Sequence, residues 1–207
     1  MSPLSGRREA TSSSLIAGLQ GCDPQAWRRL VDLYGPLVYY WCRRSGLAAA
    51  DAPDVAQEVF RSVAGAIAVF HNDQPGGTFR GWLRRITENK VRDHARAQAR
   101  RAEAVGGSAA QEFLAQVPDD VASTETDDGP AVRGLLRRAL DQIRGDFNEQ
   151  TWQAFSEGVL HGRASAEVAA ELCITANAVR KAKARVLKRL REELGDLDVD
   201  SLPGSPQ

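Results

Sequence analysis

The sequence is short of the residues that usually build catalytic or metal centres. It has three histidines and three cysteines in 207 residues. His71, His94 and His161 are far apart, and neither a His-x-x-x-His, a His-Glu nor a Cys-x-x-Cys pair occurs. A zinc site or a metal-dependent nuclease needs such ligands in a cluster. Gly-rich phosphate loops and the G-x-S-x-G nucleophile motif are also missing. We therefore expect no catalytic residue, no metal and no cofactor.

Disulfides and membrane segments are disfavoured in the same way. Cys22, Cys42 and Cys173 are odd in number and widely spaced, which is typical of a reducing compartment, and we interpret all three as packing residues. The first residues, MSPLSGRREATSSS, contain no apolar run like that of a signal peptide. Nowhere are there the roughly 18 consecutive apolar residues of a membrane span. We expect a cytoplasmic protein without membrane contact.

Net charge is absent, but the two signs are separated along the chain. The 27 Lys and Arg residues cancel the 27 Asp and Glu residues. Residues 76–101 carry eight bases and two acids, so their balance is 8 − 2 = +6, and residues 180–191 carry seven bases and no acid. Between them, residues 102–130 contain seven acids and no Lys or Arg. This middle stretch, rich in Ala, Gly and Ser, is typical of a flexible linker between two domains.

Alternating runs of β-branched residues are missing as well, so the fold class expected is all-α, with two small helical domains. The first domain spans 11–101, the acidic linker 102–130, the second domain 131–195 and a disordered tail 196–207. Asp23 and Pro24 open a long helix whose hydrogen-bond ladder is interrupted at Gly35-Pro36. The other helices are expected at about 13–20, 51–70, 78–101, 131–144, after the cap Asn148, and at 165–172 and 176–194.

The segment 78–101 changes character along its length. Phe79, Leu83 and Ile86 recur at helical spacing and predict a first half that packs against a core. Continuation of the same face reaches Asn89, Lys90, Asp93, His94 and Ala97, so the second half is expected to have little to bury. Trp82 fits two roles, because its spacing matches the core face while its ring could also stack on a base.

The segment 165–194 has helix-turn-helix spacing. A short helix, SAEVAAEL, is followed by the turn CITAN, in which Thr175 can cap a second helix. The spacing of residues in that second helix predicts an apolar face and an outward face, and the outward face contains Asn177, Arg180, Lys181, Ala184 and Arg185. Outward residues at the start of such a helix are the ones that enter a major groove. A merely solvated basic face is the alternative, although seven bases without an acid would repel one another unless an anion lay alongside.

Three segments in this order resemble bacterial RNA polymerase sigma factors of the extracytoplasmic-function group of the sigma-70 family. DAPDVAQEVFRSV (51–63) is similar to the polymerase-docking helix, TFRGWLRRITENKVRDHARAQARR (78–101) to the promoter-melting helix, and RASAEVAAELCITANAVRKAKARVLKRLREEL (163–194) to the minus-35 reader. The resemblance covers most of residues 23–194. The family's usual Gly in the helix-turn-helix turn is Cys173 here. The first domain is thereby identified with sigma region 2 and the second with sigma region 4.

The resemblance implies three groups of binding residues. Asp54, Gln57 and Glu58 would dock on core polymerase, although acids in a first helical turn often only favour the helix dipole. The minus-10 element would be bound and melted by Arg80, Trp82, Arg84, Arg85, Asn89, Lys90, Asp93 and Arg96. The minus-35 element would be read by Thr175, Asn177, Arg180, Lys181, Ala184, Arg185 and Lys188.

The partners implied are the clamp and flap regions of RNA polymerase core and promoter DNA, both duplex and single-stranded. Members of this group are commonly held by an anti-sigma factor, which makes such a partner an expectation, and the free protein is expected to be a monomer. Three rivals stay open at this point: a helix-turn-helix regulator that binds DNA without core, a nuclease, and a purely structural helical protein. A regulator would bind its operator alone, whereas a structural protein would show no salt-dependent DNA affinity.

Overall fold

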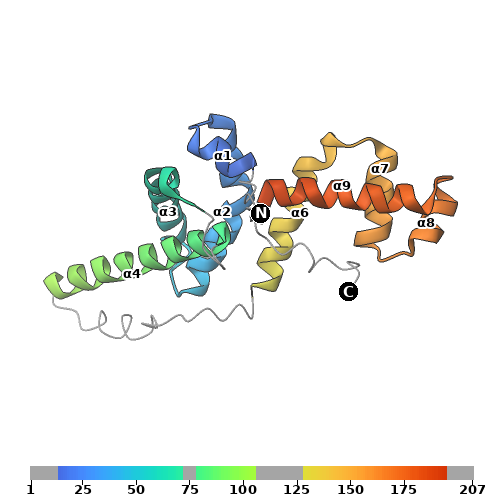
Figure 1. Ribbon diagram of the computed structural model, residues 1–207. Coiled ribbons are helices and arrows are strands. Elements are labelled where there is room, and N and C mark those ends of the chain that lie inside the picture. The colour runs from blue at the N-terminus through green and yellow to red at the C-terminus, as the bar shows by residue number, and fades with distance from the viewer. Residues whose placement is uncertain (1–13, 72–77, 106–127, 195–207) are drawn as a thin grey trace, which may run out of the picture.

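The computed structural model describes residues 14–71, 78–105 and 128–194, and every regular element in these ranges is helical (Figure 1). The prediction of an all-α fold is confirmed. Most of the expected linker and the expected tail lie outside the described residues. Within the described residues, no helix is long and apolar enough to cross a membrane.

The first module, residues 14–105, contains α1 (Ser14–Gln20), α2 (Pro24–Arg44), α3 (Ala52–Ala66), the short 3-10 turn η1 (Ile67–Val69) and α4 (Phe79–Val105). Asp23 caps α2 as predicted, because its Oδ1 accepts a hydrogen bond from Gln25 N at 2.9 Å. Gly46 ends this helix with φ 89°, a backbone conformation that suits glycine. The amide of Gln20 donates to the carbonyls of Ile67 and Phe70 and so ties α1 to the end of η1.

Helix α2 continues through Pro36 without ending. The single long helix expected here is therefore confirmed, and Pro36 interrupts its ladder by removing one N–H donor. Tyr34, Leu37 and Val38 are fully buried on both sides of the proline. The core therefore holds both halves of α2 in one helix, and the burial of these side chains outweighs the loss of a single hydrogen bond.

Helix α4 is buried along one stripe from Phe79 to Ala99, unlike the prediction. The predicted first half is correct for Phe79 and Leu83, but the second half also buries Val91, Ala95 and Ala99. Together with Thr87, whose hydroxyl donates to the carbonyl of Leu83 at 2.9 Å, these residues recur at every fourth position. Because four residues turn an α-helix by about 400°, this stripe winds slowly around α4 and follows its contact with α3.

The second module, residues 129–194, contains α6 (Gly129–Ile143), η2 (Arg144–Asp146), α7 (Glu149–Phe155), the π-helical turn η3 (Ser156–Leu160), α8 (Ser165–Glu171) and α9 (Ala176–Leu194). Asn148 caps α7 as predicted, since its side chain accepts from Thr151 N at 2.8 Å. Helix α9 packs against α7 and α8 at one end and against α6 at the other. The helix-turn-helix prediction is confirmed as a structure.

The two modules pack against each other and share one hydrophobic core. Helix α6 lies on α2, and the end of α9 lies on α1 (Figure 1). Tyr34 of α2 donates its hydroxyl to the carbonyl of Leu194 at 3.2 Å, and Arg138 of α6 donates to the carbonyl of Leu33 at 3.1 Å. Burial lowers the pKa of the Arg138 guanidinium. Both modules are thus held in a closed arrangement, with α4 and α8 at opposite ends of the molecule.

Candidate nucleic-acid and polymerase interfaces

The helix-turn-helix is held by a tight turn between α8 and α9. Cys173 has φ 52°, the left-handed conformation in which a side chain is uncommon. The turn is closed by a hydrogen bond from Ile174 N to the carbonyl of Ala169 at 3.0 Å. Thr175 then caps α9, because its hydroxyl accepts from Ala178 N at 3.1 Å. Cys173 therefore adopts the geometry for which a glycine would be the usual choice.

Helix α9 presents two distinct faces. Its buried side consists of Val179, Ala182, Val186, Leu190 and Leu194. All seven residues predicted to read the minus-35 element are exposed: Thr175, Asn177, Arg180, Lys181, Ala184, Arg185 and Lys188. The first six lie in the N-terminal half, whereas Lys188 lies further along and approaches Glu192 at 3.9 Å. The half that would enter a groove thus carries long basic side chains and one amide, which can donate to base edges and phosphates.

A charged network fixes the loop before α8. Glu157 accepts a hydrogen bond from Arg163 at 3.0 Å, and Arg163 also pairs with Glu171 of α8 at 2.7 Å. The hydrogen bond from Arg163 is the main reason why the pKa of the Glu157 carboxyl is lowered, with His161 adding to the effect. The same bond raises the pKa of Arg163. This network positions α8 relative to η3 without using any residue that faces outward from α9.

The residues predicted to bind the minus-10 element do not form one uniform surface on α4. Arg85, Asn89, Asp93 and Arg96 are exposed and follow one another along the helix. Asn89 accepts a hydrogen bond from Arg92 at 3.2 Å, and Asp93 lies 3.8 Å from Arg96. Arg80 and Lys90 are half-buried. The exposed set offers cationic and amide groups to a strand lying along the outer side of α4.

Trp82 belongs to an aromatic cluster at the start of α4. Its ring lies 4.8 Å from that of Phe70 and 5.7 Å from that of Phe79, measured between centroids. Phe79 in turn contacts Tyr34 edge to face at 5.4 Å. Because Trp82 is half-buried and packs against the core, its structural role is established by these contacts. Its role in stacking on a promoter base stays a prediction.

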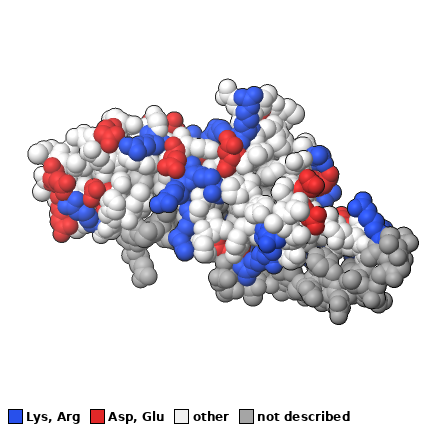
Figure 2. Space-filling view, turned by 180° about the vertical axis from the view of Figure 1, so that it is seen from behind, with Lys and Arg blue, Asp and Glu red and all other residues white. Residues whose placement is uncertain are grey.

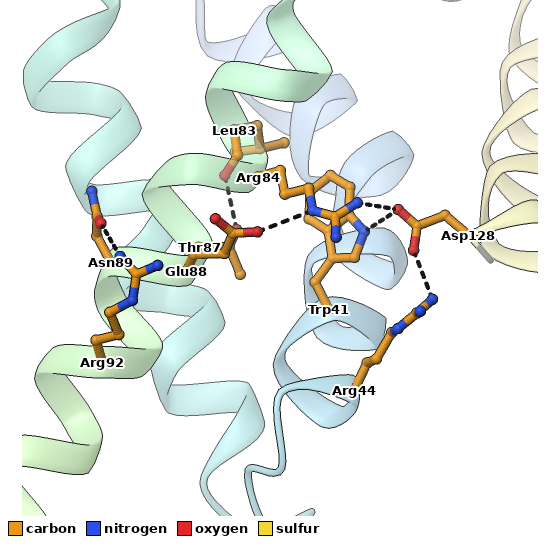
Figure 3. Close-up of polar contacts among 9 residues, drawn as sticks. All are labelled: Trp41, Arg44, Leu83, Arg84, Thr87, Glu88, Asn89, Arg92 and Asp128. Carbon is orange, nitrogen blue, oxygen red and sulfur yellow. Dashed lines mark hydrogen bonds and ion pairs between the residues drawn. The ribbon is translucent and has the colours of Figure 1, made fainter. Parts of the chain in front are cut away.

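Arg84 is engaged within the protein (Figure 3). Its Nε donates to Glu88 at 3.1 Å, and its Nη1 donates to Asp128 at 3.0 Å. The same carboxylate accepts from Trp41 Nε1 at 3.0 Å and from Arg44 at 3.3 Å. Asp128 stands immediately before α6, at the end of the stretch that the sequence indicates to be a linker. In the closed arrangement, the guanidinium of Arg84 therefore binds an acid of this chain.

The three residues predicted to dock on polymerase are exposed together on α3. Asp54, in the first turn, is joined by Gln57 and Glu58 one turn later. Arg61 pairs with Glu58, and its second nitrogen approaches the amide oxygen of Gln57 at 3.4 Å. The opposite side of α3 buries Val55, Val59 and Val63. The polar side is therefore free of the core and available to a partner protein.

Sequence reasoning missed the polar contacts that join the two modules. No polar contact was predicted for Trp41, Arg44 or Asp128, and Asp128 was counted only among the acids of the linker. The second missed contact joins Arg29 of α2 and Arg189 of α9 to Glu193, which is fully buried. A buried Glu near the end of a helix carries no periodic signal. Among the described residues, no cluster of His, Cys, Asp or Glu could hold a metal ion.

Charge is finely mixed on the face shown in Figure 2, where acidic and basic side chains lie next to one another. Such mixing agrees with the pairs between Arg189 and Asp146 at 2.8 Å and between Arg144 and Glu149 at 3.8 Å. That face therefore offers no broad field of one sign.

Comparisons with known proteins identify the family. The model of sigma-70 region 2 matches residues 30–101, which run from α2 into α4. RNA polymerase sigma factor CarQ of Myxococcus xanthus is 30% identical over 175 residues, covering 84% of this chain and 92% of CarQ. The chain belongs to the RNA polymerase sigma factors. Within them it belongs to the extracytoplasmic-function (ECF) group of the sigma-70 family, and it directs RNA polymerase in transcription initiation.

Other relatives of this sigma factor carry the ECF name. SigD of Mycobacterium tuberculosis is 28% identical over 195 residues, which cover 91% of this chain and 84% of SigD. SigE of Mycolicibacterium smegmatis is 31% identical over 170 residues, covering 82% of this chain and 62% of SigE. Among solved structures, CnrH in complex with the cytosolic domain of CnrY matches with a TM-score of 0.35 and 24% identity, covering 85% of this chain and 92% of CnrH.

Proposed function

We propose that this sigma factor engages polymerase and promoter through three separate surfaces. The exposed side of α3, with Asp54, Gln57 and Glu58, docks on the clamp of core polymerase. The N-terminal half of α9 reads the minus-35 duplex, while the second module also contacts the flap. The exposed residues of α4, with Arg80, Trp82, Arg84 and Lys90 beside them, hold the minus-10 strand after it separates. The chain itself catalyses no reaction.

One observation carries this proposal. All seven residues on α8–α9 that the resemblance implies for minus-35 reading are exposed, while the apolar side of α9 is buried against its own module. The N-terminal half of this basic helix carries no acid and is therefore suited to bind a polyanion such as DNA. Neutralisation of phosphates by its basic side chains releases counterions, which favours binding. Bidentate contacts from Arg or Asn to base edges would then add about 1–3 kcal/mol of discrimination each.

Run-off transcription tests the proposal as a whole. Core polymerase with this chain should start transcripts at defined positions on genomic fragments, including the region upstream of its own gene, and core alone should not. Arg185→Ala should reduce this selectivity while the fold is retained. DNA binding that is equally specific without core would instead support an ordinary helix-turn-helix regulator. Absence of any gain in selectivity with core would refute the proposal.

Separate experiments test the two functions of the first module. Charge reversal of Asp54 and Glu58 to Lys should abolish co-purification with core polymerase. Asp32→Lys is the matched control, because Asp32 is an exposed acid on α2, outside the proposed docking surface. For the melting step, permanganate should modify thymines near the minus-10 element only in the presence of holoenzyme. Retained binding after the charge reversal would eliminate the α3 surface.

The remaining partners are part of the same proposal. The free protein is a cytoplasmic monomer, and an anti-sigma factor holds it until an inducing signal arrives. The sigma-factor relatives support the cytoplasmic location, and membership in the ECF group, whose members are commonly held by an anti-sigma factor, supports that partner. Co-expression with the product of an adjacent gene, followed by size-exclusion chromatography, would show whether such a factor binds this chain.

A further inference from the structure

The residue just before the second module, Asp128, uses its side chain in an unusual way. Asp128 is the N-cap of α6, and its backbone carbonyl accepts from Val132 N at 2.8 Å. Aspartate is favoured at this position because its carboxylate can accept from the free N–H groups of the first turn. Here the side chain makes no such hydrogen bond. The carboxylate turns away from its own helix and reaches the first module instead.

Three donors converge on that carboxylate, as Figure 3 shows. Trp41 Nε1 and Arg84 Nη1 each donate to Oδ2 at 3.0 Å, and Arg44 Nη1 approaches Oδ1 at 3.3 Å. The Asp128 side chain is only 6% exposed. An indole N–H and a guanidinium can donate but cannot accept, so the three side chains favour an anion over any neutral or cationic group. The donors come from α2 and α4, whereas the anion comes from the N-cap residue just before α6.

We propose that Trp41, Arg44 and Arg84 form a binding site for a backbone phosphate of single-stranded promoter DNA, and that Asp128 occupies this site in the closed arrangement. The inference rests on the proposed function of α4 as the helix that holds the separated minus-10 strand. Guanidinium groups match phosphate oxygens as well as they match carboxylate oxygens. The site is therefore suited to either anion.

The local charges favour the exchange of the Asp128 carboxylate for a phosphate. With Asp128 in place, Arg84 pairs with two acids, Glu88 and Asp128. When Asp128 leaves, Arg84 keeps only Glu88 of these two, and the indole N–H of Trp41 loses its acceptor. A buried donor without an acceptor is unfavourable. A phosphate from a strand lying along the outer side of α4 would restore both the charge balance and the hydrogen bond.

The exchange couples DNA binding to separation of the modules. Asp128 cannot leave the site without moving the start of α6, which packs on α2. Occupation of the site by phosphate therefore disfavours the closed arrangement, and separation of the modules in turn raises the affinity for phosphate. By linkage, the two effects are equal in size. The acid just before α6 thus acts as an internal competitor of the promoter strand.

The decisive variant is Asp128→Asn, which keeps the size of the side chain and removes its charge. The probe is a fluorescein-labelled 12-nucleotide single strand of mixed sequence, and its anisotropy is measured with the full-length chain over a range of KCl concentrations. Asp128→Asn should bind this strand several-fold more tightly than the wild type. A plot of the logarithm of its binding constant against the logarithm of the KCl concentration should be steeper by about 0.7, the value for one additional phosphate on single-stranded DNA. Adding Arg44→Gln should cancel both changes.

Asp141→Asn is the matched control, since Asp141 is an exposed acid on α6 and its loss changes the net charge equally. Far-ultraviolet circular dichroism checks that each variant is folded. Energy transfer between fluorophores on the exposed Cys22 and Cys173, one in each module, should decrease in Asp128→Asn and stay unchanged in Asp141→Asn.

Equal salt slopes for the two Asn variants would overturn the inference, whether or not Asp128→Asn separates the modules. The holoenzyme gives an independent measurement, because core polymerase is expected to hold the modules apart. There Arg44→Gln should shorten the lifetime of heparin-resistant promoter complexes several-fold, and an unchanged lifetime would count equally against the site. Failure of the wild-type chain to support run-off transcription would refute the proposed function instead.

Discussion

Two cysteines have positive φ angles, and both lie in turns that join helices. Cys22, with φ 57°, connects α1 to α2, and Cys173, with φ 52°, connects α8 to α9. A residue with a Cβ atom pays about 1–2 kcal/mol to adopt the left-handed conformation. Both cysteines are exposed, so neither gains much from burial in return. The strain is instead tolerated because the flanking helices are fixed by their own packing.

Cys173→Gly should therefore stabilise the second module. The gain from relieved strain is partly offset by the greater freedom of glycine in the unfolded chain, so we expect a net gain of about 0.5–1 kcal/mol. Urea denaturation followed by circular dichroism measures it. Cys173→Ala serves as the control, because alanine removes the thiol but keeps the Cβ atom. A gain of the same size in Cys173→Ala would show that the thiol, and not the backbone, is the source.

Cys42 should behave differently from the other two cysteines. Burial in α2 raises the pKa of its thiol to about 11. Since only the thiolate reacts, a disulfide reagent at pH 8 should titrate two thiols per native chain and the third only after denaturation. Because the folded state favours the neutral thiol, Cys42 should also lower stability as the pH rises above about 8.5 toward 11. Rapid titration of three thiols in the native protein would contradict this.

Single residues were predictable where their role is local. The caps Asp23, Asn148 and Thr175 follow from side chains that accept hydrogen bonds from N–H groups two or three residues away. Asp128 has the same chemistry and the same position before a helix, yet its carboxylate is used 44 and more residues away in sequence. The choice between these two uses depends on the tertiary fold, so local sequence could not decide it.

At the scale of elements, α4 shows how far periodicity can be trusted. Large apolar residues mark the core face of its first half, and that part of the prediction is confirmed. In the second half the buried stripe consists of Val91, Ala95 and Ala99, small side chains that bring α4 close to α3. Alanine is also a good helix former on exposed faces, so these small residues did not mark the second half as buried. The four-residue spacing of Val91, Ala95 and Ala99 was visible in the sequence, but nothing in the composition marked this face of the helix as the buried face.

The loop before α8 gives the second module an acid-sensitive element. Glu157 has a lowered pKa because of its hydrogen bond from Arg163, so its contribution is present above the unfolded-state pKa of about 4.3 and is lost as the pH falls through the lower folded value. At pH values below 4.5, the melting temperature of the wild type should therefore decrease more steeply with falling pH than that of Glu157→Gln. Glu167→Gln, a change at an exposed acid of α8, should melt like the wild type. Parallel melting curves for the wild type and Glu157→Gln would contradict this account.

At the scale of the molecule, the sequence predicts two modules and their order but not their contact. The acids of residues 102–130 favour a tether that keeps the modules independent. In the structure, Leu135, Leu136 and Leu140 of α6 pack with α2 in one shared core. An apolar face on α6 was predictable, whereas its partner was not, because a helix can bury such a face against its own module or against another. The buried Glu193 also belongs to this contact.

Glu193 and its two arginines should respond unequally to substitution. Its side chain is completely buried, and Oε1 has no hydrogen-bond partner among the described residues. The side chains of Arg29 and Arg189 are 37% and 26% exposed, so each can turn to water when its partner is lost. Removing both arginines leaves a buried charge unpaired, which typically costs about 3–5 kcal/mol, whereas Glu193→Gln should cost about 1 kcal/mol.

The structure also indicates how the molecule should respond when both arginines are removed and the Glu193 charge is left unpaired. Separation of the modules returns Glu193 to water, so Arg29→Ala/Arg189→Ala should open the molecule before either module unfolds. Energy transfer between Cys22 and Cys173 should then decrease while the helical signal is kept. Arg28→Ala/Lys181→Ala is the control, because both residues are exposed and their loss removes the same charge. An equal loss of energy transfer in Glu193→Gln would show that the carboxylate holds the modules together by attraction rather than by the cost of leaving it unpaired.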